Sequence, residues 1–246
     1  MNMGSESSNS FQLPPDVLEI CDLAENIVSK ELMPLEAEFL NSSDHAFGIK
    51  ETINLESVFG KGTLDHLMKI AKETGLWTLM IPEEFGGAGL SMLSKVAILE
   101  KFYYTAVPFP FANVPNILYD CKGEQIEKYL NPVMSGEKTT CFAQTEANAG
   151  SDPGRMMQTK AIKDGDDWII NGTKMWISMA AESDVMMVQV VTDDEKRQRG
   201  GITMFLVDRN NPGVKVEEDG IKTWLGPRAS QYIVHFDDCR VSGDAI

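Results

Sequence analysis

The sequence predicts an α+β protein in which an all-helical N-terminal domain precedes a β-barrel or β-sandwich domain. Through the first half of the chain, apolar residues recur every three or four positions, which is the spacing of one face of a helix. From about Cys141, short β-rich runs alternate with loops that carry glycine and charge. Many short strands at regular spacing are typical of a barrel or a sandwich.

Four segments show the helical spacing. Local signals mark their ends: Pro34 should kink or end the first, Gly75 caps the second at its C-terminus, Ser91 caps the third at its N-terminus, and Ser135-Gly136 stops the fourth. The segment 41–62, between the first two, is expected to be rich in loops. The four faces comprise Val17, Cys21, Ala24, Val28 and Leu32; Leu64, Leu67, Met68 and Ala71; Met92, Val96, Leu99 and Tyr103; and Ile126, Tyr129, Leu130 and Val133.

The second half contains several strand candidates and two turn signals. Asp164-Gly165 and Asn171-Gly172 are typical of hairpin turns, because both residues of such a turn tolerate positive φ. Loops with charge and glycine separate the later candidates. The predicted strands are 168–170, 173–178, 185–191, 201–207 and 232–236.

The bulk properties exclude several classes of function. A net charge of −15 leaves no broad basic surface to neutralise phosphates, which argues against nucleic-acid binding. The four cysteines form no C-x-x-C pair and the three histidines lie far apart, so we expect reduced thiols and no metal site. No stretch is long and apolar enough to span a bilayer, and the polar start carries no secretory or transit signal. We therefore expect a soluble, cytoplasmic protein.

The segment 142–152 (FAQTEANAGSD) is the most informative loop. Gly150 allows the backbone to approach a ligand closely, and the hydroxyls of Thr145 and Ser151 can donate or accept hydrogen bonds. Such a loop could hold a phosphate group. An ordinary polar turn explains the same string when it is taken alone.

The segment 171–178 (NGTKMWIS) adds support. A tight turn leads into a strand, where Trp176 offers a flat apolar face and Ser178 offers a hydroxyl on the same side, because residues two apart point the same way. A tryptophan in the core of a barrel is the alternative interpretation.

Five stretches, in the right order, resemble the acyl-CoA dehydrogenase family. They are the two segments above together with 81–90 (IPEEFGGAGL), 129–137 (YLNPVMSGE) and 235–241 (HFDDCRV). The resemblance runs from about Pro15 to the last residue. It implies a helical domain at 15–138 and a middle β-domain at 139–246; the polar start leads us to expect a disordered N-terminus at 1–14. In the family, flavin binds at the junction of these domains with a C-terminal helical domain.

The resemblance also assigns residues to an FAD site. Thr145 would bond the polar edge of the flavin, and Ser151 would reach the FAD pyrophosphate or the phosphopantetheine of the acyl-CoA substrate. Trp176 would pack on the isoalloxazine ring, and Ser178, where the family usually has threonine, would bond near N5. The complete set of cofactor-binding residues is Phe142, Thr145, Gly150, Ser151, Trp176, Ile177 and Ser178.

Three further features bear on this site. The family commonly has proline where Ala147 stands, which could loosen the loop. Glu146 sits in the motif, but we expect it to bond loop amides rather than to act as a base. The run Phe102-Tyr103-Tyr104 matches part of the acyl pocket, although core packing is expected for at least two of the three.

The implied function is FAD-dependent α,β-dehydrogenation of an acyl-CoA thioester, with electrons passing to an electron-transfer flavoprotein. No catalytic residue carries over, because the family's base lies in a C-terminal domain that has no match in these residues. This chain alone is therefore expected to be inactive, and the complete protein to be a homo- or hetero-oligomer. The acyl-CoA is anionic, and Arg155, Lys160, Lys174 and Arg228 could offset the negative field. The alternatives are a non-catalytic subunit that supports a flavin site and an acyl-CoA oxidase; the acyl group stays open.

Overall fold

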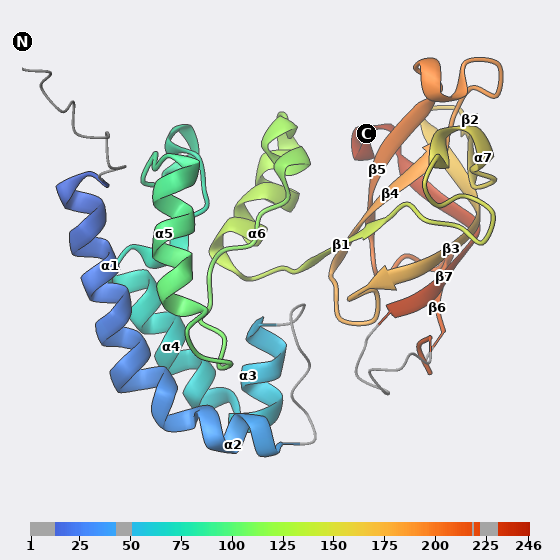
Figure 1. Cartoon of the computed structure of the whole chain (residues 1–246). Helices are drawn as coiled ribbons and strands as arrows, with labels where there is room; N and C mark the ends of the chain where they lie inside the picture. The colour runs from blue at the N-terminus through green and yellow to red at the C-terminus, as the bar shows by residue number, and fades with distance from the viewer. Residues whose placement is uncertain (1–12, 43–50, 218, 222–230) are drawn as a thin grey trace, which may run out of the picture. The chain divides into compact units, whose positions relative to one another are not determined.

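The computed structural model describes residues 13–42, 51–217, 219–221 and 231–246. These residues fall into two compact units, one of 13–42 with Glu51–Phe111 and the other of Ala112–Ile246. Helices build the first unit and a β-sheet dominates the second, so the predicted α+β class is confirmed (Figure 1). The segment 1–14, expected to be disordered, lies almost wholly outside the described residues.

The first predicted helical face is buried at all five of its positions, from Val17 to Leu32. Pro34 does not end the helical path, because it stands in the first turn of a 3₁₀ segment, where its missing N–H has no partner to lose. The unit contains α1 (Pro15–Ile27), α2 (Glu36–Asn41), α3 (Glu51–Phe59), α4 (Lys61–Glu73) and α5 (Met92–Phe102), with a π-helical turn at Val28–Leu32 and 3₁₀ turns at Met33–Leu35, Leu76–Thr78 and Glu83–Phe85.

Local capping signals in this unit were predicted correctly. Gly75 follows α4 with φ of +77°, and the Ser91 hydroxyl accepts a hydrogen bond of 3.1 Å from the Ser94 amide at the start of α5. The expectation of a loop-rich segment at 41–62 was wrong where the structure describes it, because α3 and the start of α4 occupy most of it.

The predicted apolar face of α5 lies on its exposed side. Met92 is 69% and Val96 55% exposed, whereas Ile98 and Phe102 on the other side are buried. Phe102 stacks on Phe109 with ring centroids 4.5 Å apart. Tyr103 and Tyr104 are 69% and 79% exposed, so the expectation that at least two residues of this aromatic run pack in the core was wrong. The helix ends at Phe102, and the next two side chains no longer follow its buried stripe.

The second unit is built on one mixed, seven-stranded sheet. Its strands lie in the order β1-β4-β2-β3-β7-β6, and β5 pairs with β4. β1 runs parallel to β4, while β4–β5, β2–β3, β3–β7 and β6–β7 are antiparallel. The sheet curls, because β1 and β3 contact each other although they are not neighbours in this order. The strands are β1 (Thr140–Ala143), β2 (Lys160–Asp164), β3 (Asp167–Ser178), β4 (Val185–Val191), β5 (Ile202–Asp208), β6 (Val214–Val216) and β7 (Gln231–Ser242).

Asn171-Gly172 is not the predicted hairpin turn, whereas Asp164-Gly165 does turn between β2 and β3. Asn171 and Gly172 lie inside β3, where the pairing with β7 shifts register. The Asn171 side chain bonds Asp238 on β7, accepting its amide hydrogen bond at 2.8 Å. A Cβ on Gly172 would lie 2.6 Å from Thr159 Cα. The glycine therefore allows two chain segments to approach closely, as at other β-bulges.

Short helices complete the second unit. They are η5 (Asn116–Asp120), η6 (Ile126–Leu130), α6 (Asn131–Ser135), α7 (Pro153–Met156), η7 (Arg197–Arg199) and η8 (Gly243–Ala245). Three of them, η6, η7 and η8, contact β5. The Tyr129 hydroxyl donates to the Leu206 carbonyl at 3.4 Å, and α6 ends at Gly136 with φ of +83°, as predicted. These helices belong to the same compact unit as the sheet. The domain boundary between residues 138 and 139, which the family resemblance implies, stays a prediction.

The four cysteines are all free thiols, and three of them, Cys21, Cys141 and Cys239, are buried. Within the described ranges, no cluster of three or more histidine, cysteine or acidic residues could hold a metal ion. None of the described helices has both the length and the apolar character needed to cross a membrane.

We predict that Gly172→Ala lowers the free energy of unfolding by about 1–3 kcal/mol, because the new methyl group would overlap Thr159 at a residue whose φ is +149°. Urea denaturation of the purified chain measures this loss. Gly150→Ala is the matched control, since its Cβ would meet no atom within 4 Å, and it should stay within about 0.5 kcal/mol of the parent. Equal stability of the two variants would contradict the close approach at Gly172.

Candidate functional site

β1 leads into a loop at residues 144–159, here called the glycine loop, which contains most of the predicted site residues. Its first turn is tight: the amide of Glu146 donates to the Ala149 carbonyl at 3.0 Å, and the amide of Ala149 returns a bond of 3.1 Å to the Glu146 carbonyl. Ala147 and Asn148 form the tip of that turn. This pair of backbone bonds closes the turn with alanine at position 147; whether Ala147 loosens the loop stays a prediction.

Glu146 and Lys174 form an ion pair inside the sheet unit. Lys174 Nζ donates to Glu146 Oε1 at 2.9 Å and to the Gln144 carbonyl at 3.0 Å. The two side chains are 0% and 5% exposed for lysine and glutamate respectively. The suggestion that Lys174 offsets the charge of a ligand was therefore wrong, because the ammonium is turned into the protein and neutralised there.

The Glu146 carboxylate also accepts two backbone hydrogen bonds, from the amide of Gln158 at 2.6 Å and from the amide of Thr159 at 3.0 Å. The expectation that Glu146 bonds loop amides is confirmed. Glu146 lies near the start of the glycine loop, and Gln158 and Thr159 lie at its end. One carboxylate therefore joins the two ends of the loop, and this junction is here called its neck.

The pKa values of Glu146 and Lys174 are both lowered from their ordinary values, for different reasons. Burial alone would raise the pKa of the Glu146 carboxyl, but the hydrogen bonds from Thr159, Gln158 and Lys174, with the lysine's charge, lower that pKa below its ordinary value. Burial lowers the pKa of the Lys174 ammonium, and the bond and charge of Glu146 offset only part of this. At neutral pH the carboxylate is thus ionised, and its oxygens are occupied by hydrogen bonds within the protein.

The strand β3 carries Trp176 on a bulge directly after Lys174. The register of β3 against β7 shifts between Lys174 and Ile177, and Trp176 has a left-handed backbone with φ of +62°. Such a conformation costs a residue with a Cβ about 1–2 kcal/mol. The indole is 47% exposed. A large apolar ring that is held outward by a strained backbone is the kind of feature that marks a binding site.

Other predicted residues lie on neighbouring segments. The amide of Met175 donates to the Thr145 carbonyl at 2.8 Å, which joins the glycine loop to the bulged strand. Phe142 on β1 is 46% exposed. Among the residues that the structure describes, the hydroxyls of Thr145, Ser151 and Ser178 have no hydrogen-bond partner, so each is available to a ligand.

Ile177, Gly150 and Ser151 differ from that group. The Ile177 side chain is 2% exposed and packs in the core of the sheet, so only its backbone could meet a cofactor. Gly150 and Ser151 lie exposed on the glycine loop. A Cβ on Gly150 would meet nothing, and its φ is not positive, so the chain itself does not require glycine there. The open space above its backbone fits the approach of a ligand.

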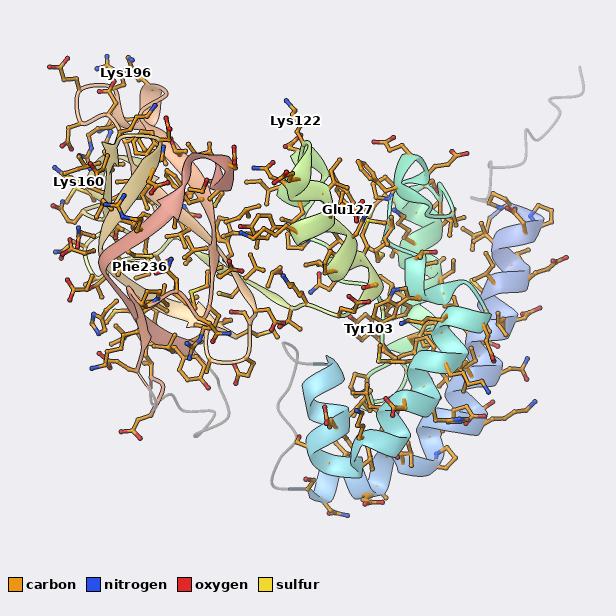
Figure 2. The ribbon with its side chains drawn as sticks, turned by 180° about the vertical axis from the view of Figure 1, so that it is seen from behind. Tyr103, Lys122, Glu127, Lys160, Lys196 and Phe236 are labelled. Atoms are coloured by element: carbon orange, nitrogen blue, oxygen red, sulfur yellow. The ribbon has the colours of Figure 1, made fainter. Side chains whose placement is uncertain are left out.

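The remaining suggested cations are engaged at the surface. Lys160 pairs with Asp194 at 2.5 Å and Arg155 with Asp152 at 3.4 Å. Figure 2 shows Lys160 and Lys196 toward the same end of the sheet unit. Arg228 lies outside the described residues.

The sequence analysis predicted neither the Glu146–Lys174 ion pair nor the bulge at Trp176. A signal was present: strand alternation places Lys174 on the same side as Ile170, a buried core residue, and a lysine there needs a buried partner.

Comparison with known proteins gives the family context. Residues 14–137 match the acyl-CoA dehydrogenase N-terminal domain, and residues 141–239 match the acyl-CoA dehydrogenase middle domain. The short-chain specific acyl-CoA dehydrogenase of Rattus norvegicus mitochondria is 33% identical, over 85% of this chain and 52% of its own. The (R)-benzylsuccinyl-CoA dehydrogenase of Thauera aromatica is 28% identical, over 96% of this chain and 58% of its own. The chain thus spans little more than half the length of these relatives.

Solved structures agree with this. The glutaryl-coenzyme A dehydrogenase in its glutaryl-CoA complex is 26% identical with a TM-score of 0.70, over 96% of this chain and 57% of that one. A heteromeric neighbour, the ChsE4-ChsE5 complex from Mycobacterium tuberculosis, has a TM-score of 0.73 over 96% of this chain and 56% of that one, and at 21% identity it shows the fold alone.

We predict that Glu146→Gln lowers the free energy of unfolding at pH 7 by about 3–5 kcal/mol, because it leaves the Lys174 ammonium buried without a counter-charge. The folded-state pKa of Glu146 lies below its ordinary value of 4.5, so its contribution is complete above that pH and is lost as the pH falls through the folded-state pKa. The difference between parent and variant should therefore be constant from pH 7 to about pH 5 and shrink below pH 4.5.

Urea denaturation at a series of pH values measures this difference. Asp164→Asn is the control, because it removes an exposed partner of Arg240 on the same sheet and should change stability by no more than about 1 kcal/mol. A difference that stays unchanged down to pH 3, or that is no larger than the control's, would contradict the predicted role of the carboxylate.

Proposed function

The chain is a member of the acyl-CoA dehydrogenase family, and from that premise we propose that it forms the flavin-binding part of an FAD-dependent enzyme that dehydrogenates an acyl-CoA thioester. The observation that carries the proposal is Trp176, a half-exposed indole on a strained bulge beside the glycine loop. Strain at an exposed aromatic residue is difficult to explain by the needs of the fold alone.

The residues present fit the cofactor's chemistry. The Trp176 indole offers an apolar surface to a flat ring, and the free hydroxyls of Thr145 and Ser178 offer bonds to its polar edge. The open backbone at Gly150 and the hydroxyl of Ser151 suit a phosphate, and in the same proposal Ser151 also reaches the substrate. Phe142 and the backbone of Ile177 complete the proposed set. When bound, FAD would supply the acceptor for the hydride that leaves the β-carbon.

The α-proton of the substrate needs a base, and we propose that this base lies in a part of the relatives' length that these residues do not match. Glu146 is unsuited to the role, since its carboxylate is buried and already accepts three hydrogen bonds. We further propose that an electron-transfer flavoprotein takes the electrons, that the complete enzyme is an oligomer, and that it acts in the cytoplasm.

Two alternative functions can be distinguished from a dehydrogenase by experiment. An acyl-CoA oxidase would pass its electrons to oxygen, and a scaffold subunit would support a flavin site without turnover. Reoxidation of reduced flavin in air distinguishes the oxidase from the dehydrogenase.

We predict that titration with FAD quenches tryptophan fluorescence and that Trp176→Ala removes most of the quench. The variant should also bind FAD up to roughly tenfold more weakly, since an aromatic contact is worth about 0.5–1.5 kcal/mol. Trp168→Phe is the control, because Trp168 packs within the sheet against Phe205, with ring centroids 5.6 Å apart. Parent-like quenching in Trp176→Ala would reject the stacking role.

We also predict that residues 1–246, purified alone and loaded with FAD, do not bleach the flavin when acyl-CoA thioesters are added under nitrogen, because the proposed base lies outside these residues. Activity should appear when the C-terminal helical domain of a relative is supplied. Robust bleaching by the 246-residue chain alone would show that a base does lie within it, and Glu146 would then be the first residue to replace.

A further inference from the structure

The glycine loop and β3, which both carry predicted cofactor-binding residues, are joined by the buried ion pair of Glu146 and Lys174. Lys174 Nζ holds the Gln144 carbonyl and the Glu146 carboxylate, which flank Thr145 in the glycine loop. One residue after Lys174, the Met175 amide bonds the Thr145 carbonyl at 2.8 Å. Three hydrogen bonds, at residues 144, 145 and 146, therefore fix the position of Thr145 relative to β3.

The second bulge of β3 begins directly after Lys174. In a regular strand, residues two apart point to the same face, so a buried Lys174 would bring Trp176 inside with it. Lys174 is 0% and Ile177 2% exposed, and both are held in the interior. Two residues, Met175 and Trp176, stand between these anchors where regular alternation allows one, and the extra residue turns the indole outward.

The neck of the glycine loop depends on the carboxylate as well. Gln158 and Thr159 donate their amides to Glu146, so the loop that carries Gly150 and Ser151 begins and ends on one side chain. Loss of this carboxylate would remove the side-chain contact that joins the two ends of the loop.

We propose that Glu146 and Lys174 are positioning residues: their ion pair sets the spacing between Thr145 and Trp176 and holds the glycine loop closed at its neck. The inference that the positioned ligand is FAD rests on the proposed function, whereas the positioning itself does not. Neither residue touches the cofactor, and each acts through the backbone that it holds.

The test compares Glu146→Gln with the double variant Glu146→Gln/Lys174→Met, which removes both charges and keeps side-chain size. The double variant should recover much of the parent's stability, because no unpaired charge remains buried. A positioning role predicts that it does not recover the geometry. Hydrogen exchange of the Gln158, Thr159 and Met175 amides, measured by NMR without FAD, should be at least about tenfold faster in both variants, the equivalent of about 1.4 kcal/mol of local opening.

A second readout is the dissociation constant for FAD, which should rise at least about tenfold in both variants, while Asp164→Asn behaves as the parent does. If the double variant regains parent-like amide exchange and FAD affinity along with its stability, the pair only fills space and the proposal is overturned. If the parent itself does not bind FAD, the proposed function fails, and the amide exchange still decides whether the pair positions the loop and the strand.

Discussion

The buried contact between Glu146 and Lys174 is the constraint on which the candidate site depends. Removing two charges from water is costly, and an ion pair of this kind is often no more stabilising than a well-packed apolar pair of the same size. The ion pair matters here because its hydrogen bonds are directional. The ammonium and the carboxylate together bind a carbonyl and two amides from separate parts of the chain, and apolar side chains could hold those segments together without fixing their spacing.

Features that depend on local chemistry could be predicted from the sequence. Gly75 and Gly136 end helices because they adopt positive φ at little cost, and Ser91 caps α5 through its own hydroxyl. The run at 185–191 was predicted as a strand and forms β4, which is buried at every position except Gln189. The family resemblance added the order of the domains and the identity of the motif residues.

Features that depend on distant partners could not be predicted. Asn171-Gly172 has the composition of a hairpin turn, but Asp238 and Thr159 determine its conformation, and neither is near it in sequence. Lysine in a strand is usually solvated, so the burial of Lys174 becomes apparent only when Glu146 is seen beside it. The α5 face was ambiguous for a similar reason, since apolar residues occur on two sides of that helix and tertiary packing selected one.

The shared burial of Lys174 and Glu146 also has an evolutionary consequence. A mutation at either position passes through a chain in which one charge is left inside without its partner, and selection against such intermediates is strong when native proteins are only marginally stable. The residues at the two positions should therefore change together in evolution. Among descendants of a common ancestral chain, a neutral residue at one of these positions should be found together with a neutral residue at the other, even though 28 positions separate them in sequence.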